Sequence, residues 1–452
     1  MASGAILVGL IAGAVVVSWN GSDGSGEDDA AAGAEADADA TVDADSGGTS
    51  DSSEGDNPPD GVVEITPDLL IRPSLAPIIA DEGTVGAFVN ARTEYDQYTA
   101  FPNPELDAFI DESFPLMLVY TPYFDDKTER FTNEMAYLDL YAIYNNDADP
   151  RSRTNPEWIL EDEDGEKLFI PFDCKNGTCP QYAADPGDPS FRQHILDEVA
   201  RIERTGYNRL FLDDVNLARR VSDGTGEEVA PLDPRTGEEM SEEAWATYVV
   251  ELVELIREEF PNLQIAHNPI WFVDSPGFTS ELQWRQIGAA DYIMIERSFT
   301  DPGLVEGTGQ FGFTSFLTWL ELLHREGRGL IYLDQHAETA SEHEFNIAGY
   351  LLVNEGKDVV GTEALNRVSP PELWDGYRVD LGAAQGPYYL WRSLLRRDFD
   401  GGTVLLNPPD AQRVTVDLEQ TYLTLQNDSV TSVTLDETEA VILRVDDASA
   451  EE

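Results

Sequence analysis

The stretch RLFLDDVN, residues 209–216, runs from an apolar segment directly into two aspartates and an asparagine. A short, continuous apolar run is typical of a strand that is buried on both faces of a parallel sheet. Two carboxylates at the end of such a strand need polar surroundings. The carboxyl edge of a parallel sheet provides them, because its loops build ligand and active sites there. The stretch therefore predicts a parallel α/β fold with a polar site at one edge of the sheet.

Segments of the same kind recur along the chain after residue 80, and the stretches between them carry helical patterns. Apolar residues recur at three and four positions in residues 191–205, 241–260 and 313–326, as on the buried face of a helix. Eight buried strands alternating with helices are the pattern of a (β/α)8 TIM barrel. The third segment also fits a helix. The predicted strands are GAFVN (86–90), PLMLVY (115–120), LYAIYNN (140–146), RLFLDD (209–214), LQIAHN (263–268), YIMIE (292–296), LIYLD (330–334) and DVVG (358–361).

The two ends of the chain differ from this pattern. From residue 388 to 452, short apolar segments alternate with turn residues and leave no room for helices, which predicts a small antiparallel β domain. Residues 1–20 contain an apolar run that is shorter than the about 20 residues of a membrane span, and they fit a signal-like or anchor segment. Residues 21–62 are small and acidic, as in a disordered linker. Residues 63–387 remain for the barrel.

The composition limits the possible partners. The chain has 452 residues, with 87 acidic and 28 basic side chains and a net charge of −59 at pH 7. Such an excess of acid indicates adaptation to high salt, where counterions screen surface carboxylates over short distances. It also argues against nucleic acid as a partner, since phosphates would be repelled.

Two cysteines, Cys174 and Cys179, lie close together in DCKNGTCPQY. An isolated pair at this spacing is neither a zinc site nor a CxxC redox motif, so the sequence predicts no metal or other cofactor here. We expect a local disulfide rather than two free thiols. A disulfide places the protein outside the cytoplasm, either extracellular or at the cell surface, where the N-terminal segment could attach it to a membrane.

The strand ends supply the candidate site residues. In a barrel, polar residues at the carboxyl ends of strands point into the active-site mouth. Asp213 and Asp214 end the fourth predicted strand, and Glu296 ends the sixth. Two carboxyls on different strands suit the hydrolysis of a glycosidic bond, where one protonates the leaving oxygen and the other is nucleophile or base.

Other polar and aromatic residues near the strand ends are candidates for binding a carbohydrate substrate. Amides, acids and histidines can hydrogen-bond sugar hydroxyls, and tryptophans can stack on the apolar faces of sugar rings. The sequence lacks a glycine-rich phosphate loop after a strand and lacks a serine nucleophile elbow. The candidates are Asn90, Arg92, Asn145, Trp158, His267, Asn268, Trp271, Asp334 and His336.

The strand GYNRLFLDDVN (206–216) resembles the GFDGVFLDNVD-type strand of the endo-α-1,4-polygalactosaminidase family and of related hypothetical glycosyl hydrolase families. The likeness extends over roughly residues 85–445. It implies a barrel glycoside hydrolase that retains stereochemistry, with Asp213 matching the catalytic Asp. In ADYIMIERSF, Glu296 stands where the partner Glu belongs. Asp214 stands where the family has Asn, so Asp214 is the alternate working acid and the family's substrate is not inherited.

Each candidate also has a structural explanation. Asp213 and Asp214 can cap a helix that follows the strand, and Glu296 can form a buried ion pair with Arg297. The histidines are as consistent with local hydrogen bonds as with substrate contacts. Asp334 is as consistent with capping as with sugar binding, and the tryptophans fit the core.

The sequence thus predicts an exported glycoside hydrolase. The alternative is a non-catalytic cell-surface protein that binds glycan or supports the envelope on the same barrel. The two differ in one geometric requirement. The enzyme needs the carboxyls of Glu296 and of Asp213 or Asp214 to face the same cleft.

Overall fold

In a computed structural model, the described residues are 73–91, 93–146, 149–269, 280–309, 311–362 and 373–445. The chain divides into two units, Met1–Gly61 and Val62–Glu452, and every described residue belongs to the second. The predicted N-terminal segment and acidic linker therefore lie outside the described residues. Within the described residues, no helix is both long enough and apolar enough to cross a membrane.

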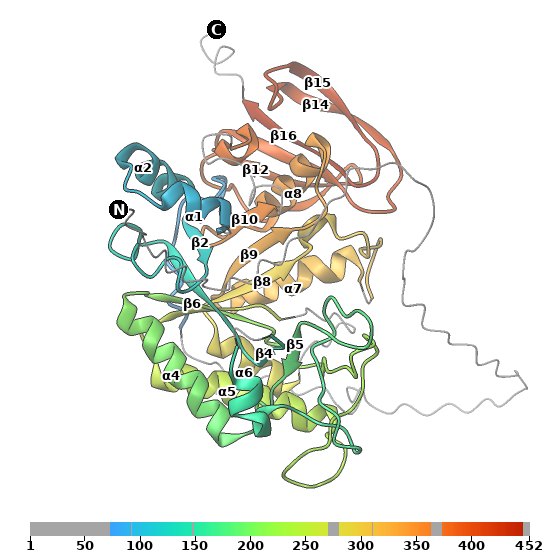
Figure 1. The fold of residues 1–452 in the computed structure, drawn as a ribbon. Coiled ribbons are helices and arrows are strands. Elements are labelled where there is room, and N and C mark those ends of the chain that lie inside the picture. The colour runs from blue at the N-terminus through green and yellow to red at the C-terminus, as the bar shows by residue number, and fades with distance from the viewer. Residues whose placement is uncertain are drawn as a thin grey trace, which may run out of the picture. The chain divides into compact units, whose positions relative to one another are not determined.

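Eight parallel strands form one sheet in the order β1-β2-β3-β6-β7-β8-β9-β10 (Figure 1). A parallel bridge between Ala87 and Val360 joins the two ends of this sheet, and the Val360 amide donates to the carbonyl of Gly86 at 2.8 Å. The sheet therefore nearly closes, which confirms the predicted TIM barrel. The strands are β1 (Phe88–Ala91), β2 (Leu116–Val119), β3 (Glu134–Asp139), β6 (Arg209–Asp213), β7 (Gln264–His267), β8 (Tyr292–Glu296), β9 (Gly329–Asp334) and β10 (Val359–Thr362).

The prediction of the third strand was wrong. The third barrel strand is β3, with the sequence EMAYLD, and it pairs with β2 and β6. The predicted segment LYAIYNN instead holds β4 (Ala142–Tyr144), which pairs with β5 (Gln181–Ala183) in a separate two-stranded sheet. Two short apolar runs adjoin here, and periodicity does not show which of them enters the sheet. As a result, Asp139 rather than Asn145 ends the third barrel strand.

Helices cover the outside of the barrel. The three predicted helical segments are confirmed by α4, α5 and α7, and α5 begins after Ser241, whose side chain accepts from the Ala244 amide. Residues 120–133, all of them described, form turns between β2 and β3 where the alternating pattern predicted a helix. The main helices are α1 (Thr93–Thr99), α2 (Pro104–Ser113), α4 (Pro189–Thr205), α5 (Glu242–Glu259), α6 (Glu281–Ala289), α7 (Phe313–Arg325) and α8 (Ala340–Val353).

Two separate groups of buried side chains show which way each strand residue points. The larger group fills the space between strands and helices. Because neighbouring side chains on a strand point to opposite faces, the smaller group marks the barrel interior and assigns a side to every polar residue at a strand end. The interior group contains Phe88, Leu116, Leu118, Met135, Phe211, Ala266, Tyr292, Met294, Ile331, Leu333 and Val359.

Residues 73–80 form a strap across the amino end of the barrel. Ala76 is buried with the interior group. The Leu75 amide donates to Asp291 Oδ1 at 2.7 Å, and Gln264 Nε2 donates to the Leu75 carbonyl at 3.1 Å. Asp291 and Gln264 lie where β8 and β7 begin, so the strap covers the end of the barrel opposite the predicted mouth.

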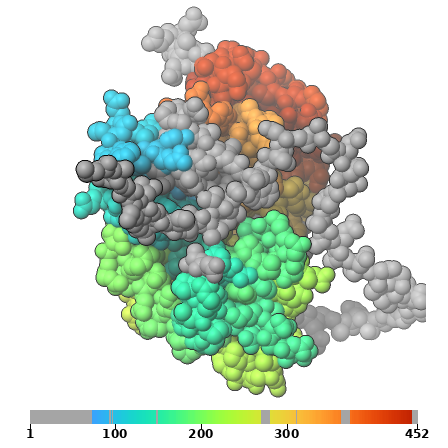
Figure 2. Space-filling model, viewed as in Figure 1, coloured from blue at the N-terminus to red at the C-terminus, as the bar shows by residue number. Residues whose placement is uncertain are grey.

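The C-terminal strands form the predicted antiparallel domain, with the order β11-β12-β13-β16-β14-β15. Arg397 joins this sheet to the barrel, because its Nη1 donates to the carbonyls of Leu351 and Asn354 at the end of α8, each at 2.9 Å. In Figure 2 these strands, coloured red, form one end of the visible face. β14 is one long strand that runs from the segment RVTVDL (413–418) into the start of the segment YLTLQN (422–427). The bounds are β11 (Tyr389–Trp391), β12 (Leu394–Phe399), β13 (Gly402–Asn407), β14 (Val414–Leu423), β15 (Ser429–Leu435) and β16 (Glu439–Val445).

Candidate active site

Four acidic residues lie at the carboxyl ends of three barrel strands. Asp139 ends β3 and Asp213 ends β6, and the two are Cα partners across these neighbouring strands. Alternation from Met135 and Phe211 places both on the inner face. Asp214 follows directly, and Glu296 ends β8 on the same face as Met294. The barrel therefore brings the three predicted catalytic acids to one rim and adds Asp139.

Asp213 is held by three hydrogen-bond donors. The Tyr137 hydroxyl donates to Oδ2 at 2.7 Å. Asn268 Nδ2 and the Asp214 amide donate to Oδ1 at 2.8 and 2.9 Å. Donors on both oxygens stabilise the ionised carboxylate and fix its orientation. The sequence predicted Asn268 at this rim, but it gave no sign of Tyr137, which reaches Asp213 from the neighbouring strand.

Asp214 has the opposite environment. Its backbone is left-handed, with φ 56°, a region that few residues other than glycine adopt. Burial raises the pKa of its carboxyl well above the usual range, and Asp139, Asp213 and Glu296 add to this effect against the opposing charge of Arg220. The proton is therefore held more tightly than on an ordinary aspartate. Residues 214–241, all described, contain no helix, so Asp213 and Asp214 do not cap one.

Asp139 is the functional candidate that the sequence reasoning missed. Its Oδ1 accepts from the amides of Tyr141 and Ala142 at 3.2 and 2.8 Å. Burial and the neighbouring charge of Asp213 raise its pKa to about 7. A usable signal was present, because EMAYLD is an apolar run ending in an acid, as are RLFLD and YIMIE. The adjoining segment LYAIYNN (140–146) has the same apolar pattern, so the sequence does not show which of the two forms the barrel strand.

Glu296 is exposed, which excludes the buried ion pair considered for it. Arg297 follows with φ 66°, so strand geometry ends at Glu296. The Arg297 guanidinium is also exposed, and it lies 3.8 Å from Asp301 Oδ1. Glu296 thus combines an inward-facing position with access to solvent, which a group that exchanges protons with substrate and water requires.

Two predicted binding residues lie on the outer face of the barrel. His267 follows the inward-facing Ala266 and is fully buried, and its ring nitrogens have no hydrogen-bond partner within the described residues. Burial, with Arg257 and Arg328 nearby, lowers its pKa to about 3, so the ring is neutral. This placement is that of a packing residue in the helix layer.

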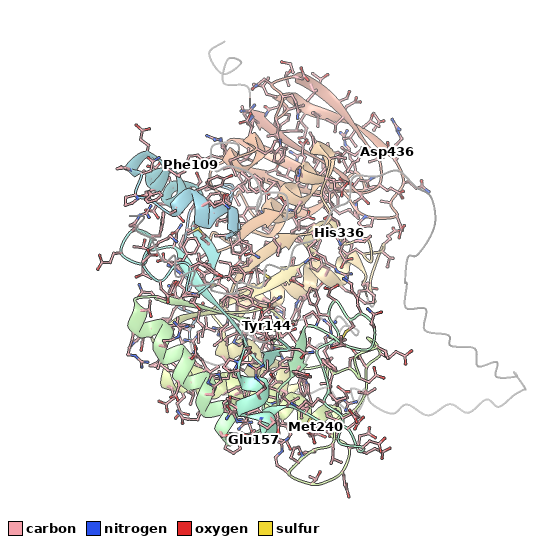
Figure 3. All side chains as sticks on the ribbon, in the orientation of Figure 1. Phe109, Tyr144, Glu157, Met240, His336 and Asp436 are labelled. Atoms are coloured by element: carbon pink, nitrogen blue, oxygen red, sulfur yellow. A yellow bond between two sulfur atoms is a disulfide. The ribbon has the colours of Figure 1, made fainter. Side chains whose placement is uncertain are left out.

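Asp334 likewise lies on the outer face and is fully buried. Its Oδ1 accepts from the Thr300 hydroxyl at 2.5 Å and from the amides of His336 and Ala337 at 2.8 and 2.9 Å. These contacts are those of a cap for the loop after β9. His336 itself is exposed at this loop and is labelled in Figure 3.

The remaining binding candidates are dispersed. Asn90 is buried on the inner face of β1, on the same side as Phe88. Asn145 follows β4, and its Nδ2 donates to the Thr178 hydroxyl at 3.1 Å. Trp158 is buried, stacks on His194 with ring centroids 5.0 Å apart, and so presents no open face for a sugar. Arg92 and Trp271 lie outside the described residues.

The predicted disulfide between Cys174 and Cys179 is present, with an S–S distance of 2.10 Å. It closes a loop that precedes β5, and Asn145 binds that loop from the end of β4. In Figure 3, Tyr144 of β4 lies near the centre of the view, while Glu157 and Met240 lie at the periphery. Among the described residues, no group of three or more His, Cys, Asp or Glu side chains has an arrangement that could hold a metal ion.

No protein-family model and no curated protein sequence matches the chain. Solved structures of glycoside hydrolases are similar to it at low identity. The glycoside hydrolase domain of PelA from Pseudomonas aeruginosa has 17% identity and a TM-score of 0.39, over 63% of this chain and 96% of that one. A maltogenic alpha-amylase from Thermotoga neapolitana has 11% identity and a TM-score of 0.42, over 80% and 98% of the two chains. At these values the likenesses carry no inference about mechanism, and the polygalactosaminidase resemblance remains an expectation from the sequence.

Proposed function

We propose that this protein is an exported glycoside hydrolase that cleaves O-glycosidic bonds of a polysaccharide or glycan at the carboxyl end of its barrel. One observation carries the proposal. Carboxyl groups from β3, β6 and β8 gather at one rim, and their environments differ. Hydrogen-bond donors fix the orientation of the Asp213 carboxyl, while burial and neighbouring acids favour a proton on Asp214. Glycoside hydrolysis requires two nearby carboxyl groups with different proton affinities, one to act as acid and one as base or nucleophile.

In the proposed mechanism Asp213 is the nucleophile or base and Glu296 is the general acid. Glu296 gives a proton to the leaving glycosidic oxygen as the bond from the anomeric carbon breaks. The carboxylate of Asp213 either attacks that carbon or takes a proton from an attacking water. Tyr137 and Asn268 keep its oxygens oriented toward the mouth in both cases.

The stereochemical outcome follows from the separation of the two carboxyls. About 5–5.5 Å leaves room for direct attack and gives retention, whereas about 6.5–9.5 Å leaves room for a water and gives inversion. We expect retention. Proton NMR of the first product, recorded before mutarotation, distinguishes the outcomes, and an inverted anomer would assign Asp213 as base instead of nucleophile.

Asp214 is the alternate to Asp213, and the leaving group tests whether Glu296, rather than Asp214, is the general acid. A general acid matters little when the leaving group is already acidic, as in an aryl glycoside. We expect Glu296→Gln to lose activity on a polysaccharide and to recover most of it on an aryl glycoside of the same sugar. If Asp214→Asn shows this recovery and Glu296→Gln does not, the two roles exchange.

The test of the function itself is a panel of polysaccharides incubated with the purified protein at molar salt. The proposal expects release of reducing ends from at least one polymer, lost in Asp213→Asn and in Glu296→Gln. The matched control is Glu258→Gln, the same chemical change at an exposed site on α5, which should retain full activity. Binding of a glycan without turnover, equal in all variants, would instead support the non-catalytic alternative.

A further inference from the structure

The carboxyl of Asp139 has no part in the reaction proposed above, yet it lies beside the carboxyl that does. Asp139 and Asp213 are Cα partners on adjacent parallel strands, with both side chains on the inner face. Neighbouring strands are about 4.8 Å apart. Two carboxylates at such a separation, largely removed from water, repel each other strongly, so one of the pair favours a proton.

The donors around the carboxyls decide which one keeps its charge. Asp213 accepts from three donors at 2.7–2.9 Å. Asp139 uses Oδ1 to bind two backbone amides, and among the described residues its Oδ2 meets one distant donor, Gln181 Nε2 at 3.5 Å. Asp214 Oδ1 accepts from Asn216 Nδ2 at 3.1 Å. The charge therefore belongs on Asp213, and a proton belongs on Asp139 or Asp214.

The cations near this cluster are bound to other acids. Arg151 Nη2 lies 2.6 Å from Asp149 Oδ2, and Arg220 Nε lies 3.9 Å from Glu228 Oε1. Within the described residues, no lysine or arginine forms an ion pair with any of the three mouth aspartates. Neutralisation by a basic side chain is therefore not what allows them to lie together.

The other titratable groups around the aspartates do not offset their charge. Burial raises the pKa of Tyr137 and Tyr141 well above the usual range and that of Tyr144 to about 12, so these hydroxyls stay neutral. Glu296 on β8 adds negative charge on the side of Asp214 whenever it has given up its proton. Burial and the neighbouring acids therefore make a third aspartate charge unfavourable, which favours retention of one proton.

We propose that Asp139 is a positioning residue of the active site, which shares a single proton with Asp214, so that Asp213 keeps its full negative charge and the three aspartates together carry two charges instead of three. The role of this proton in catalysis rests on the proposed function, whereas its presence on the Asp139–Asp214 pair does not. When that proton dissociates at higher pH, the added negative charge changes the electrostatic environment of the Asp213 carboxylate. The alkaline limb of the activity profile therefore depends on the Asp139–Asp214 pair as well as on the proton of Glu296.

The proton can be observed without any substrate. Infrared difference spectra between the wild-type protein and each variant isolate the carbonyl stretch of protonated carboxyls. At pH 6, above the usual aspartate range, we expect the wild-type protein to show more of this absorption than Asp139→Asn and than Asp214→Asn. Glu258→Gln should match the wild type. Equal absorption in the wild-type protein and Asp139→Asn would overturn the inference.

The activity profile is the second readout. Asn at position 139 still accepts the two amide hydrogen bonds but does not repel Asp214, so we expect the alkaline limb of kcat/KM to move at least about one unit to lower pH. A merely structural role would lower activity at every pH and leave the limb in place, which would contradict the inference. If the wild-type protein hydrolyses no glycan, the proposed function fails. The infrared spectra still show whether the Asp139–Asp214 pair holds a proton.

Discussion

Buried acids at the two ends of the barrel have different partners. At the amino end, Asp291 binds Arg257 at 2.6 Å and Asp358 binds His324 at 2.9 Å, so these two acids have basic partners. At the carboxyl end, the acids of β3 and β6 face other acids. Both ends are built from the same strands and lie in the same chain of net charge −59.

This difference separates structural acids from candidate functional ones. A buried acid with a base and backbone amides around it is a neutral unit that joins elements of the fold. Acids that are grouped without bases raise one another's pKa, and their mutual repulsion is unfavourable for folding. Such groups are therefore found mainly at sites where their altered pKa values serve a reaction. Replacing one acid at each end with its amide should therefore give opposite results. The substitution at the mouth should lower activity, and the substitution beside the strap should lower stability.

The largest effect is expected at the mouth. Asp213→Asn removes the charged nucleophile or base while Tyr137 and Asn268 keep partners, so turnover should fall by about a thousandfold or more, about 4 kcal/mol in activation free energy. The melting temperature should stay the same or rise, because one of several like charges is gone. Initial rates and calorimetry on the same preparation check both statements, and a large drop in melting temperature would place Asp213 with the structural acids.

The next effect is expected at the amino end. Asp291→Asn leaves Arg257 buried without its counter-charge and weakens the contact to Leu75, so the free energy of unfolding should fall by about 3–5 kcal/mol. Urea denaturation at constant molar salt measures the change. The control is Asp436→Asn, which breaks the exposed pair with Arg413 and should cost less than about 1 kcal/mol. Equal losses in the two variants would remove the distinction between buried and exposed pairs.

A smaller effect is expected from pH. The pKa of Asp139 is raised to about 7 in the folded protein. Between about pH 4 and pH 7 the unfolded chain loses this proton while the folded protein keeps it, so the group lowers stability progressively as pH rises. Asp139→Asn should therefore be more stable than the wild type above pH 7, by about 4 kcal/mol at most, with little difference near pH 4. Unfolding measured at both pH values tests this, and a constant difference would refute it.

The smallest effect is expected at the disulfide loop that precedes β5. Replacing Cys174 and Cys179 with serine opens a short loop, whose closure contributes about 2 kcal/mol at most. Turnover should stay within about twofold of the wild type, since the bridge holds a loop and no acid of the mouth. Mass spectrometry without reduction first verifies the bond in the parent protein. A loss of activity comparable with that of Asp213→Asn would make the loop part of the site.

The sequence predicted most of the fold, because buried parallel strands leave continuous apolar runs. It placed the acids of the fourth and sixth strands and the disulfide. It misassigned the third strand because two apolar runs adjoin, and with that strand it lost Asp139. It also did not show that His267 and Asp334 face outward. In a strand buried on both sides, inner and outer residues are equally apolar, so the pattern does not reveal which face is the interior.

The strap at residues 73–80 has a consequence for how the protein is held. It lies at the amino end of the barrel, where it contacts Asp291 and Gln264, so the chain enters the described part of the fold on the side away from the mouth. A protein fixed to a support at residue 73, where the described part of the fold begins, would therefore direct the mouth toward the surrounding medium. Immobilisation at that position should leave access to long polymers open, whereas immobilisation through the loops that follow β6 or β8 should obstruct it.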